Sequence, residues 1–211
     1  MKKKFLITLM VVCVLLPAAL SAAVADLSIG ATAMYGGGNG QDVFEQIQAG
    51  DFSGFSDVSN YTFGVDVRVK LLIAEVDVVG MYNKTEVSGT AYHEFSTLVT
   101  GGVSLDLLGI ARLGLGIGPR FLITIDENGN TVLFDSNGTP ITNNEGFGNA
   151  LMNSPVAYRA TLDFNLGGIM AGLNYTLDSN YTFADGASVG ELFNVSPENG
   201  KVGVSILFSL L

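Results

Sequence analysis

Apolar and polar residues alternate one by one through residues 61–82 of the chain. From Tyr61 to Leu71 every second residue is apolar, and the residues between them are polar or glycine. After a two-residue junction the alternation resumes at Ala74 and continues to Tyr82. A period of two is typical of a β-strand, and so short a junction predicts an antiparallel hairpin.

The same alternation predicts six more strands, at residues 26–36, 95–107, 111–125, 156–166, 169–178 and 201–210. In every strand the apolar phase carries no charged residue. The opposite phase carries six of the seven basic residues that follow the N-terminal segment: Arg68, Lys70, Arg112, Arg120, Arg159 and Lys201. Each of the eight strands therefore has one apolar face and one polar face.

The connections between these strands alternate in length. Those after the second, fourth and sixth strands are very short, whereas the others are long and polar, including loops expected at residues 84–94 and 126–153. Within the longest loop, a small extra hairpin is expected around residues 131–134, between two Asn-Gly pairs. This pattern predicts an all-β fold, an eight-stranded antiparallel up-and-down transmembrane β-barrel.

Alternation alone does not say which face points inward. A soluble lipocalin-like carrier would turn its aliphatic face inward and its charges to water. Three features favour the opposite arrangement: the polar face is rich in Gly, Ser and Thr, opposite charges lie at matching heights in neighbouring strands, and aromatic residues gather near strand ends on the apolar face. Lipid is therefore expected outside and paired charges inside.

Composition supports a membrane barrel. Only 14% of the residues are charged and the mean hydropathy is +0.41, yet no stretch after the N-terminus reaches the roughly 18 apolar residues of a spanning helix. High hydropathy without such a helix is expected when only alternate residues face lipid. Without three N-terminal lysines the net charge falls from −10 to −13, which argues against a nucleic-acid partner.

The N-terminal residues 1–25 have the features of a secretory signal peptide. Three lysines precede an apolar stretch at residues 5–16, and Ala23-Val24-Ala25 provides a cleavage site. Cys13, the single cysteine of the chain, would be removed with this segment. Residues 26–211 are then one outer-membrane barrel domain, exported through the periplasm to the bacterial cell outer membrane.

With these strands and connections, nearly all of the chain after residue 25 resembles the small eight-stranded outer-membrane barrels of the OmpA, OmpX and OmpW-like group. The resemblance rests on pattern rather than on a sharp motif. It implies outer-membrane lipid and the barrel-insertion machinery as partners, and an extracellular partner contacted through the long loops. It also implies an alternative function, a narrow, porin-like OmpW-like channel for small or hydrophobic molecules.

The polar faces supply the main candidate site, a network of charges in the lumen. Its expected members are Asp66, Arg68, Lys70, Glu75, Asp77, Asp106, Arg112, Arg120, Arg159 and Asp163. An eight-stranded barrel is only wide enough for side chains to fill it, which favours a structural network over an ion-lined conduit. The sequence therefore favours a structural or surface-exposed, non-enzymatic protein with a charge-paired, largely filled lumen.

No catalytic, cofactor-binding or metal-binding residues are expected. A lipid-modifying outer-membrane enzyme would need a nucleophile and a base, and His93, expected in a loop near Ser96, is the one histidine available. Three aromatic residues of the first loop, Phe44, Phe52 and Phe55, are expected to plug the mouth of the barrel.

Overall fold

The computed structural model describes residues 25–87, 90–126, 131–134, 140–141, 152, 154–182, 184, 191–193, 195–196 and 200–210. The predicted signal peptide lies outside this part of the chain except for Ala25, and so do both Asn-Gly pairs. Within these ranges, no helix is both long enough and apolar enough to cross a membrane.

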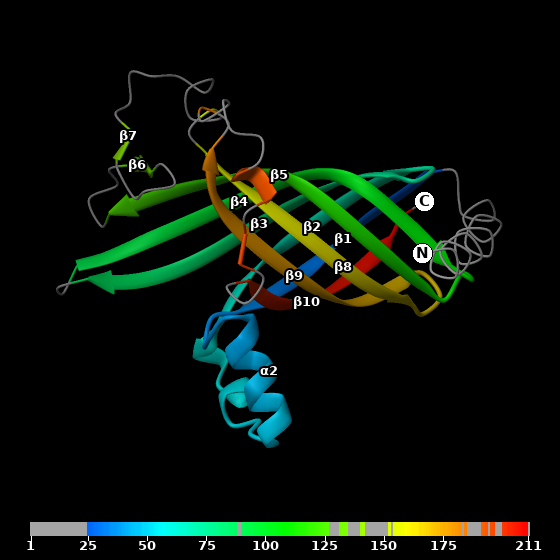
Figure 1. Cartoon of the computed structure of the whole chain (residues 1–211), viewed down its shortest axis with the longest axis horizontal. Coiled ribbons are helices and arrows are strands. Elements are labelled where there is room, and N and C mark those ends of the chain that lie inside the picture. Colours follow the sequence, from blue (N-terminus) through cyan, green and yellow to red (C-terminus); the bar gives the residue numbers. More distant parts are fainter. Residues whose placement is uncertain are drawn as a thin grey trace, which may run out of the picture.

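Eight long strands form the body of the molecule (Figure 1). They are β1 (Ala25–Tyr35), β2 (Tyr61–Leu71), β3 (Ala74–Val87), β4 (Thr90–Leu107), β5 (Ala111–Asp126), β8 (Pro155–Asn165), β9 (Ile169–Thr182) and β10 (Lys201–Ser209). Each strand pairs antiparallel with the next, β5 pairs with β8, and β10 returns to β1 and closes the ring. The predicted fold class, an all-β, eight-stranded antiparallel up-and-down barrel, is confirmed.

The short turns lie together at one end of the barrel, the end at which β1 begins and β10 ends (Figure 1). The predicted turn at Gly167 and Gly168 has φ angles of 79° and 94°, which glycine adopts without steric cost. It is closed by the N–H of Leu166, which donates to the carbonyl of Ile169 at 2.7 Å. Such turns match the twist of the strands that they join.

The prediction of a loop at residues 84–94 is wrong. β3 and β4 continue as a paired ladder through this region, as far as Val87 opposite Thr90. The polar residues here led to the prediction of a loop. In the structure the ladder is continued by backbone hydrogen bonds, which depend little on side-chain polarity, in a segment rich in residues that favour strands.

The expected extra hairpin around residues 131–134 is confirmed. β6 (Thr131–Phe134) pairs with β7 (Pro140–Ile141), and β6 also pairs with residues 123–125 of β5. β6 therefore lies alongside the last residues of β5.

The connection between β1 and β2 contains a helix that the alternation pattern did not predict. α2 (Gly40–Ala49) is followed by two short 3₁₀ turns, η1 (Gly54–Ser56) and η2 (Val58–Asn60). The side chain of Asn39 caps the first turn of α2, and Gly50, at a φ of 69°, ends the helix in the left-handed conformation. These two local signals define the helix.

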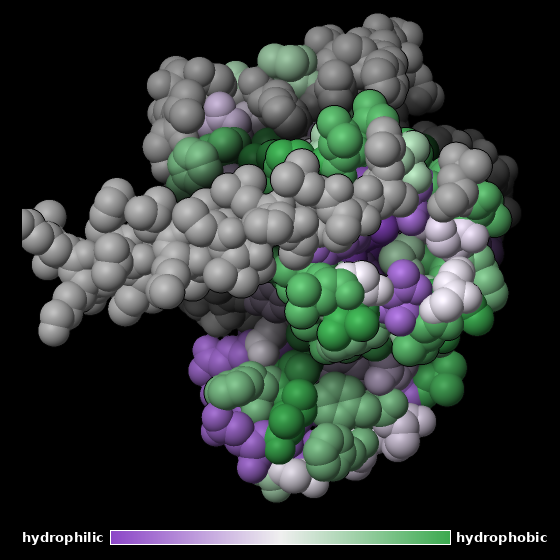
Figure 2. Space-filling view, turned by 90° about the vertical axis from the view of Figure 1, so that its right-hand side faces the viewer, coloured by the Kyte–Doolittle hydropathy of each residue, from purple (hydrophilic) through white to green (hydrophobic). Residues whose placement is uncertain are grey.

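The aliphatic face of the strands points outward, and the polar face points inward. Outward residues in the middle of the wall are strongly exposed, for example Val65 at 58% and Leu115 at 56%. Inward residues at the same level, such as Asp66 and Arg159, are buried. In Figure 2, which looks onto the end with the short turns, hydrophobic residues surround hydrophilic ones. The lipocalin-like arrangement is therefore wrong.

Some inward positions have no room for a side chain. A Cβ atom at Gly102 of β4 would lie 1.9 Å from the carbonyl oxygen of Leu115 on β5, whereas a Cβ at the neighbouring, outward Gly101 would meet nothing within 4 Å. Because the obstacle at Gly102 is backbone of the paired strand, the wall itself would have to move.

We expect Gly102→Ala to destabilise the barrel by at least the roughly 1–3 kcal/mol that overpacking costs, and Gly101→Ala to leave its stability near that of the parent. The measurement is unfolding of the refolded protein by denaturant in detergent micelles. The folded fraction is monitored by the difference in gel mobility between heated and unheated samples. Equal stability of the two variants would contradict this account of the wall.

Candidate functional site: the lumen of the barrel

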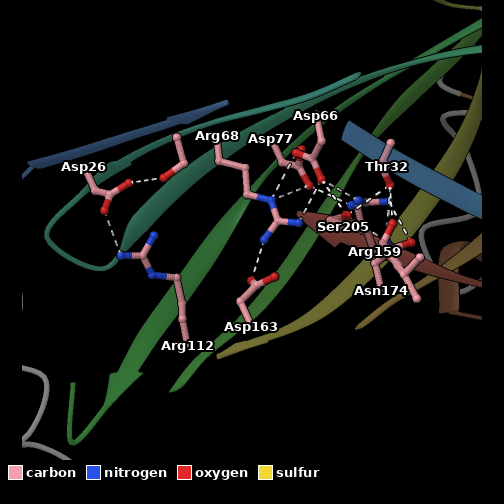
Figure 3. Close-up of polar contacts among 12 residues, drawn as sticks. Asp26, Thr32, Asp66, Arg68, Asp77, Arg112, Arg159, Asp163, Asn174 and Ser205 are labelled. Atoms are coloured by element: carbon pink, nitrogen blue, oxygen red, sulfur yellow. Dashed lines mark hydrogen bonds and ion pairs between the residues drawn. The ribbon is translucent and has the colours of Figure 1, made fainter. Parts of the chain in front are cut away.

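The centre of the lumen holds two arginines and three aspartates (Figure 3). Arg68 of β2 pairs with Asp66 at 2.8 Å (Nη2–Oδ2) and with Asp163 at 2.5 Å (Nη1–Oδ2). Arg159 of β8 pairs with Asp66 at 2.9 Å (Nη2–Oδ2) and with Asp77 at 2.7 Å (Nε–Oδ2). All five side chains are almost completely buried, so these charges are stabilised by one another rather than by water.

The central pairs reach across the lumen. β2 and β8 are four strands apart around the closed ring, so the Arg68–Asp163 and Arg159–Asp66 pairs join opposite walls. Neighbouring strands also bring opposite charges into register, as with Arg68 opposite Asp77, but that pair is longer, at 3.8 Å. Both transverse contacts are shorter than this neighbouring-strand pair, so Arg68 and Arg159 brace the barrel across its diameter.

A second charged group lies nearer the short turns. Arg112 of β5 pairs with Asp106 of β4 at 2.7 Å (Nε–Oδ1) and with Asp26 of β1 at 3.2 Å (Nη2–Oδ2), and Lys70 forms an ion pair with Asp106. Ser28 donates a hydrogen bond to Asp26. β1 and β5 also face each other across the ring, so Asp26–Arg112 is another transverse contact.

Uncharged polar residues complete the central group, as Figure 3 shows for Thr32, Asn174 and Ser205. Asn174 donates to Ser205 at 3.0 Å and accepts from Arg159 at 3.3 Å. Ser205 in turn donates to Asp66 at 3.2 Å. These residues and Asp26 were not among the expected site residues, although all of them occupy the polar phase, which was the signal that could have identified them.

Together with the buried Glu75, the two groups contain more negative than positive side chains. The acids are Asp26, Asp66, Glu75, Asp77, Asp106 and Asp163, and the bases are Arg68, Lys70, Arg112 and Arg159. Among the residues that the structure describes, Glu75 forms no ion pair, and its Oε2 has no hydrogen-bond partner. Glu75, Asp77 and Thr161 line a cavity of about 10 Å³, about the size that holds one water molecule.

An apolar layer lies above the central charges, toward the end of the barrel with the long connections. Its members are the inward-pointing residues Met34, Val79, Met81, Leu98 and Ala157, which form one buried cluster. They occupy the phase that was expected to be polar. The inward side chains are thus charged nearer the short turns and apolar nearer the long connections.

Beyond the apolar layer the barrel opens into a cavity of about 350 Å³ at its mouth. Arg120 of β5 lines this cavity and pairs with Asp178 of β9 at 2.5 Å (Nη1–Oδ2). Glu94 and Lys201 also line it. The structure therefore places Arg120 at the mouth, separated by the apolar layer from the other nine expected members of the lumen network.

His93 lies within β4 and not in a loop, so that expectation is wrong. Its Nδ1 is 2.8 Å from the hydroxyl of Tyr82, and the two rings stack. Ser96 points inward and lines the cavity at the mouth. Successive residues of a strand point to opposite faces, so His93, three residues earlier, lies on the outward face. The two side chains therefore cannot form a Ser-His pair.

Comparisons with known proteins agree only in outline with this architecture. No protein-family model matches the chain, and no curated protein matches it by sequence. Among solved structures, the chain is similar to Ail, the attachment invasion locus protein of Yersinia pestis, in complex with the heparin analogue sucrose octasulfate. The identity is 14% and the TM-score 0.40, over 88% of this chain and 95% of that one. Neisserial surface protein A is similar at 10% identity and a TM-score of 0.36, over 88% and 97%. Both likenesses are weak, and the barrel is defined by its own strand pairing.

Removing the charge of Asp66 should destabilise the protein more than removing the charge of Glu75. Asp66→Asn removes the shared anionic partner of two buried arginines, and breaking a buried pair from one side costs about 3–5 kcal/mol. Glu75→Gln removes a charge that has no ion-pair partner among the described residues, so its cost should be smaller. The free energy of unfolding in lipid vesicles, measured by urea titration, checks the order, and a larger loss for Glu75→Gln would contradict it.

Proposed function

We propose that the chain is a bacterial outer-membrane β-barrel protein with a structural or surface-exposed, non-enzymatic role. The observation that carries the proposal is the combination of an exposed aliphatic wall with a lumen filled by paired charges. An aliphatic wall of this extent is unstable in water but suits lipid, because apolar surface removed from water contributes about 25 cal/mol per Å². The proposed partners are outer-membrane lipid, the insertion machinery and an extracellular partner at the long connections.

The proposed role as a closed barrel is supported by the contents of the lumen. Arg68 and Arg159 cross it at its centre, and the layer that includes Met34, Met81 and Leu98 fills it above. An ion would have to displace hydrocarbon and then break ion pairs between opposite walls. Neither step suits a wide aqueous pore.

A second candidate function is favoured by the cavity at the mouth. Its lining combines methionine and leucine side chains with Arg120 and Lys201, a composition suited to small amphipathic molecules. A narrow OmpW-like route for small or hydrophobic molecules could begin here. Protein-dependent uptake of a hydrophobic dye into vesicles would favour this candidate over the closed barrel.

A charge on the outer wall tests the lipid contact. Val65 lies near the middle of β2 and points outward, so Val65→Arg should cost about 2–4 kcal/mol of folding free energy in a bilayer, the range for an arginine at the midplane. The measurement is urea unfolding in phospholipid vesicles, and Gln48→Arg, on the exposed surface of α2, is the matched control. If Val65→Arg were as stable as the control, the wall would not face lipid.

The closed lumen is tested by conductance. In planar bilayers, the folded protein should show no current at the level of a wide porin, because ion pairs and hydrocarbon occupy its interior. A general porin inserted under the same conditions provides the positive control. Porin-level conductance from samples shown to be folded by gel mobility would overturn the proposed closed barrel.

A further inference from the structure

The connection between β1 and β2, residues 36–60, forms a compact unit that we call the loop 1 unit. It contains α2, η1 and η2. Its ends are joined by the N–H of Gly36, which donates to the carbonyl of Asn60 at 2.7 Å, and the side chain of Asn60 donates to the carbonyl of Gly54 at 3.0 Å. The unit is therefore held in one shape by its own hydrogen bonds.

A row of aromatic rings joins the loop 1 unit to the outer wall of the barrel. Phe52 contacts Phe55 at 6.2 Å between ring centroids, and Phe55 contacts Tyr35 at 4.9 Å. Tyr35 contacts Tyr61 at 5.4 Å, and Tyr61 contacts Phe63, an exposed residue of the outward face of β2, at 6.2 Å. Tyr35 is only 3% exposed, so the row packs the unit against the wall and brings its apolar side chains next to the exposed Phe63 of β2.

The start of α2 also rests against the wall. Gly40 packs so closely on Tyr175 of β9 that a Cβ there would lie 2.6 Å from the tyrosine hydroxyl. Tyr175 occupies the outward phase of its strand, opposite Val202 of β10. The helix consequently begins beside the barrel and not above its mouth, and Figure 1 shows it directed away from the barrel, across its long axis.

The loop 1 unit exposes large hydrophobic side chains. Val43 is buried, but Phe44 and Ile47, which share its side of α2, are 60% and 51% exposed, and Phe52 is 60% exposed. None of the three aromatic residues expected to plug the mouth lines its cavity, so that expectation is wrong. At the bottom of Figure 2, hydrophobic residues of this part of the molecule face the viewer, toward the end with the short turns.

The loop 1 unit is also acidic. Glu45 points away from the hydrophobic side of α2, and the unit contains no lysine or arginine. Asp51 accepts hydrogen bonds from Ser53, and Asp57 accepts them from Ser59. The serine side chain has the larger effect and the serine backbone N–H the smaller, and both lower the pKa of the carboxyl group, which keeps it ionised in mildly acidic media. The unit therefore carries both an exposed apolar patch and ionised carboxyl groups.

From this geometry we propose that the loop 1 unit lies in the outer leaflet of the membrane, with Phe44, Ile47 and Phe52 inserted among the acyl chains near the headgroups. The inference rests on the proposed function, since it extends the lipid-facing wall sideways. Lipid is the occupant that fits, because the patch continues the barrel's own apolar band at the level where aromatic residues meet the headgroups. Without basic residues, insertion depends on the apolar side chains and not on binding lipid phosphates.

The absence of tryptophan from the chain provides a direct test. Three single-tryptophan variants are refolded into vesicles that contain lipids brominated either near the headgroup or near the chain ends: Phe44→Trp on the apolar side of α2, Glu45→Trp as the matched control one residue away, and Val65→Trp on the barrel wall. Bromine quenches tryptophan fluorescence on contact, so each variant reports the depth of one position.

We expect Phe44→Trp to lose much of its emission with bromine near the headgroup, less with bromine near the chain ends, and to emit at shorter wavelength than Glu45→Trp. Glu45→Trp should be nearly unquenched by either lipid. Val65→Trp should be quenched strongly by the bromine nearer the chain ends. This set of results would support the inference.

Three other results would overturn it. If Val65→Trp is quenched and Phe44→Trp behaves as Glu45→Trp does, the barrel spans the bilayer while the loop 1 unit stays in water, and the proposed function survives alone. If the emission of Phe44→Trp is blue-shifted but unquenched and depends on protein concentration, the apolar patch contacts a second copy of the chain and not lipid. If Val65→Trp itself is unquenched in folded protein, the proposed function fails as well.

Discussion

The structure depends on the pairing of charges that a closed barrel removes from water. Because the aliphatic face points outward, the polar face must point inward, where burying an isolated charge costs a large free energy. Arg68 and Arg159 meet this constraint by contacting carboxylates on opposite walls, and Arg112 does the same nearer the short turns. The ion pairs thereby hold the shape of the barrel as well as neutralising each other.

The lumen is divided into layers by the same constraint. Charged side chains form ion pairs in the part nearer the short turns, and a buried apolar cluster that includes Met34, Val79 and Leu98 lies nearer the long connections. Arg120 lies on the other side of this layer, at the mouth, and pairs there with Asp178. The mouth cavity and the buried charges are therefore separate sites, and a small molecule held at the mouth would not contact the central arginines.

Much of the fold could be predicted because alternation with a period of two is a strong local signal. β2 was expected at residues 61–71 and forms there, and the turn at Gly167 and Gly168 was evident from its glycines. The upper parts of β3 and β4 were missed because backbone pairing continues through polar residues. α2 was missed because its signals, the Asn39 cap and the Gly50 end, are unrelated to strand alternation.

The sequence by itself determined the number of strands, their two faces and the residues available to the lumen, because each of these follows from local periodicity and turn chemistry. Only the tertiary structure decided which charges meet. Neighbours in register such as Arg68 and Asp77 could be guessed from strand order, but the closer contacts of Arg68 with Asp163 and of Arg159 with Asp66 join strands on opposite sides of the ring. Closure of the barrel brings those side chains together, and closure is a property of the whole sheet.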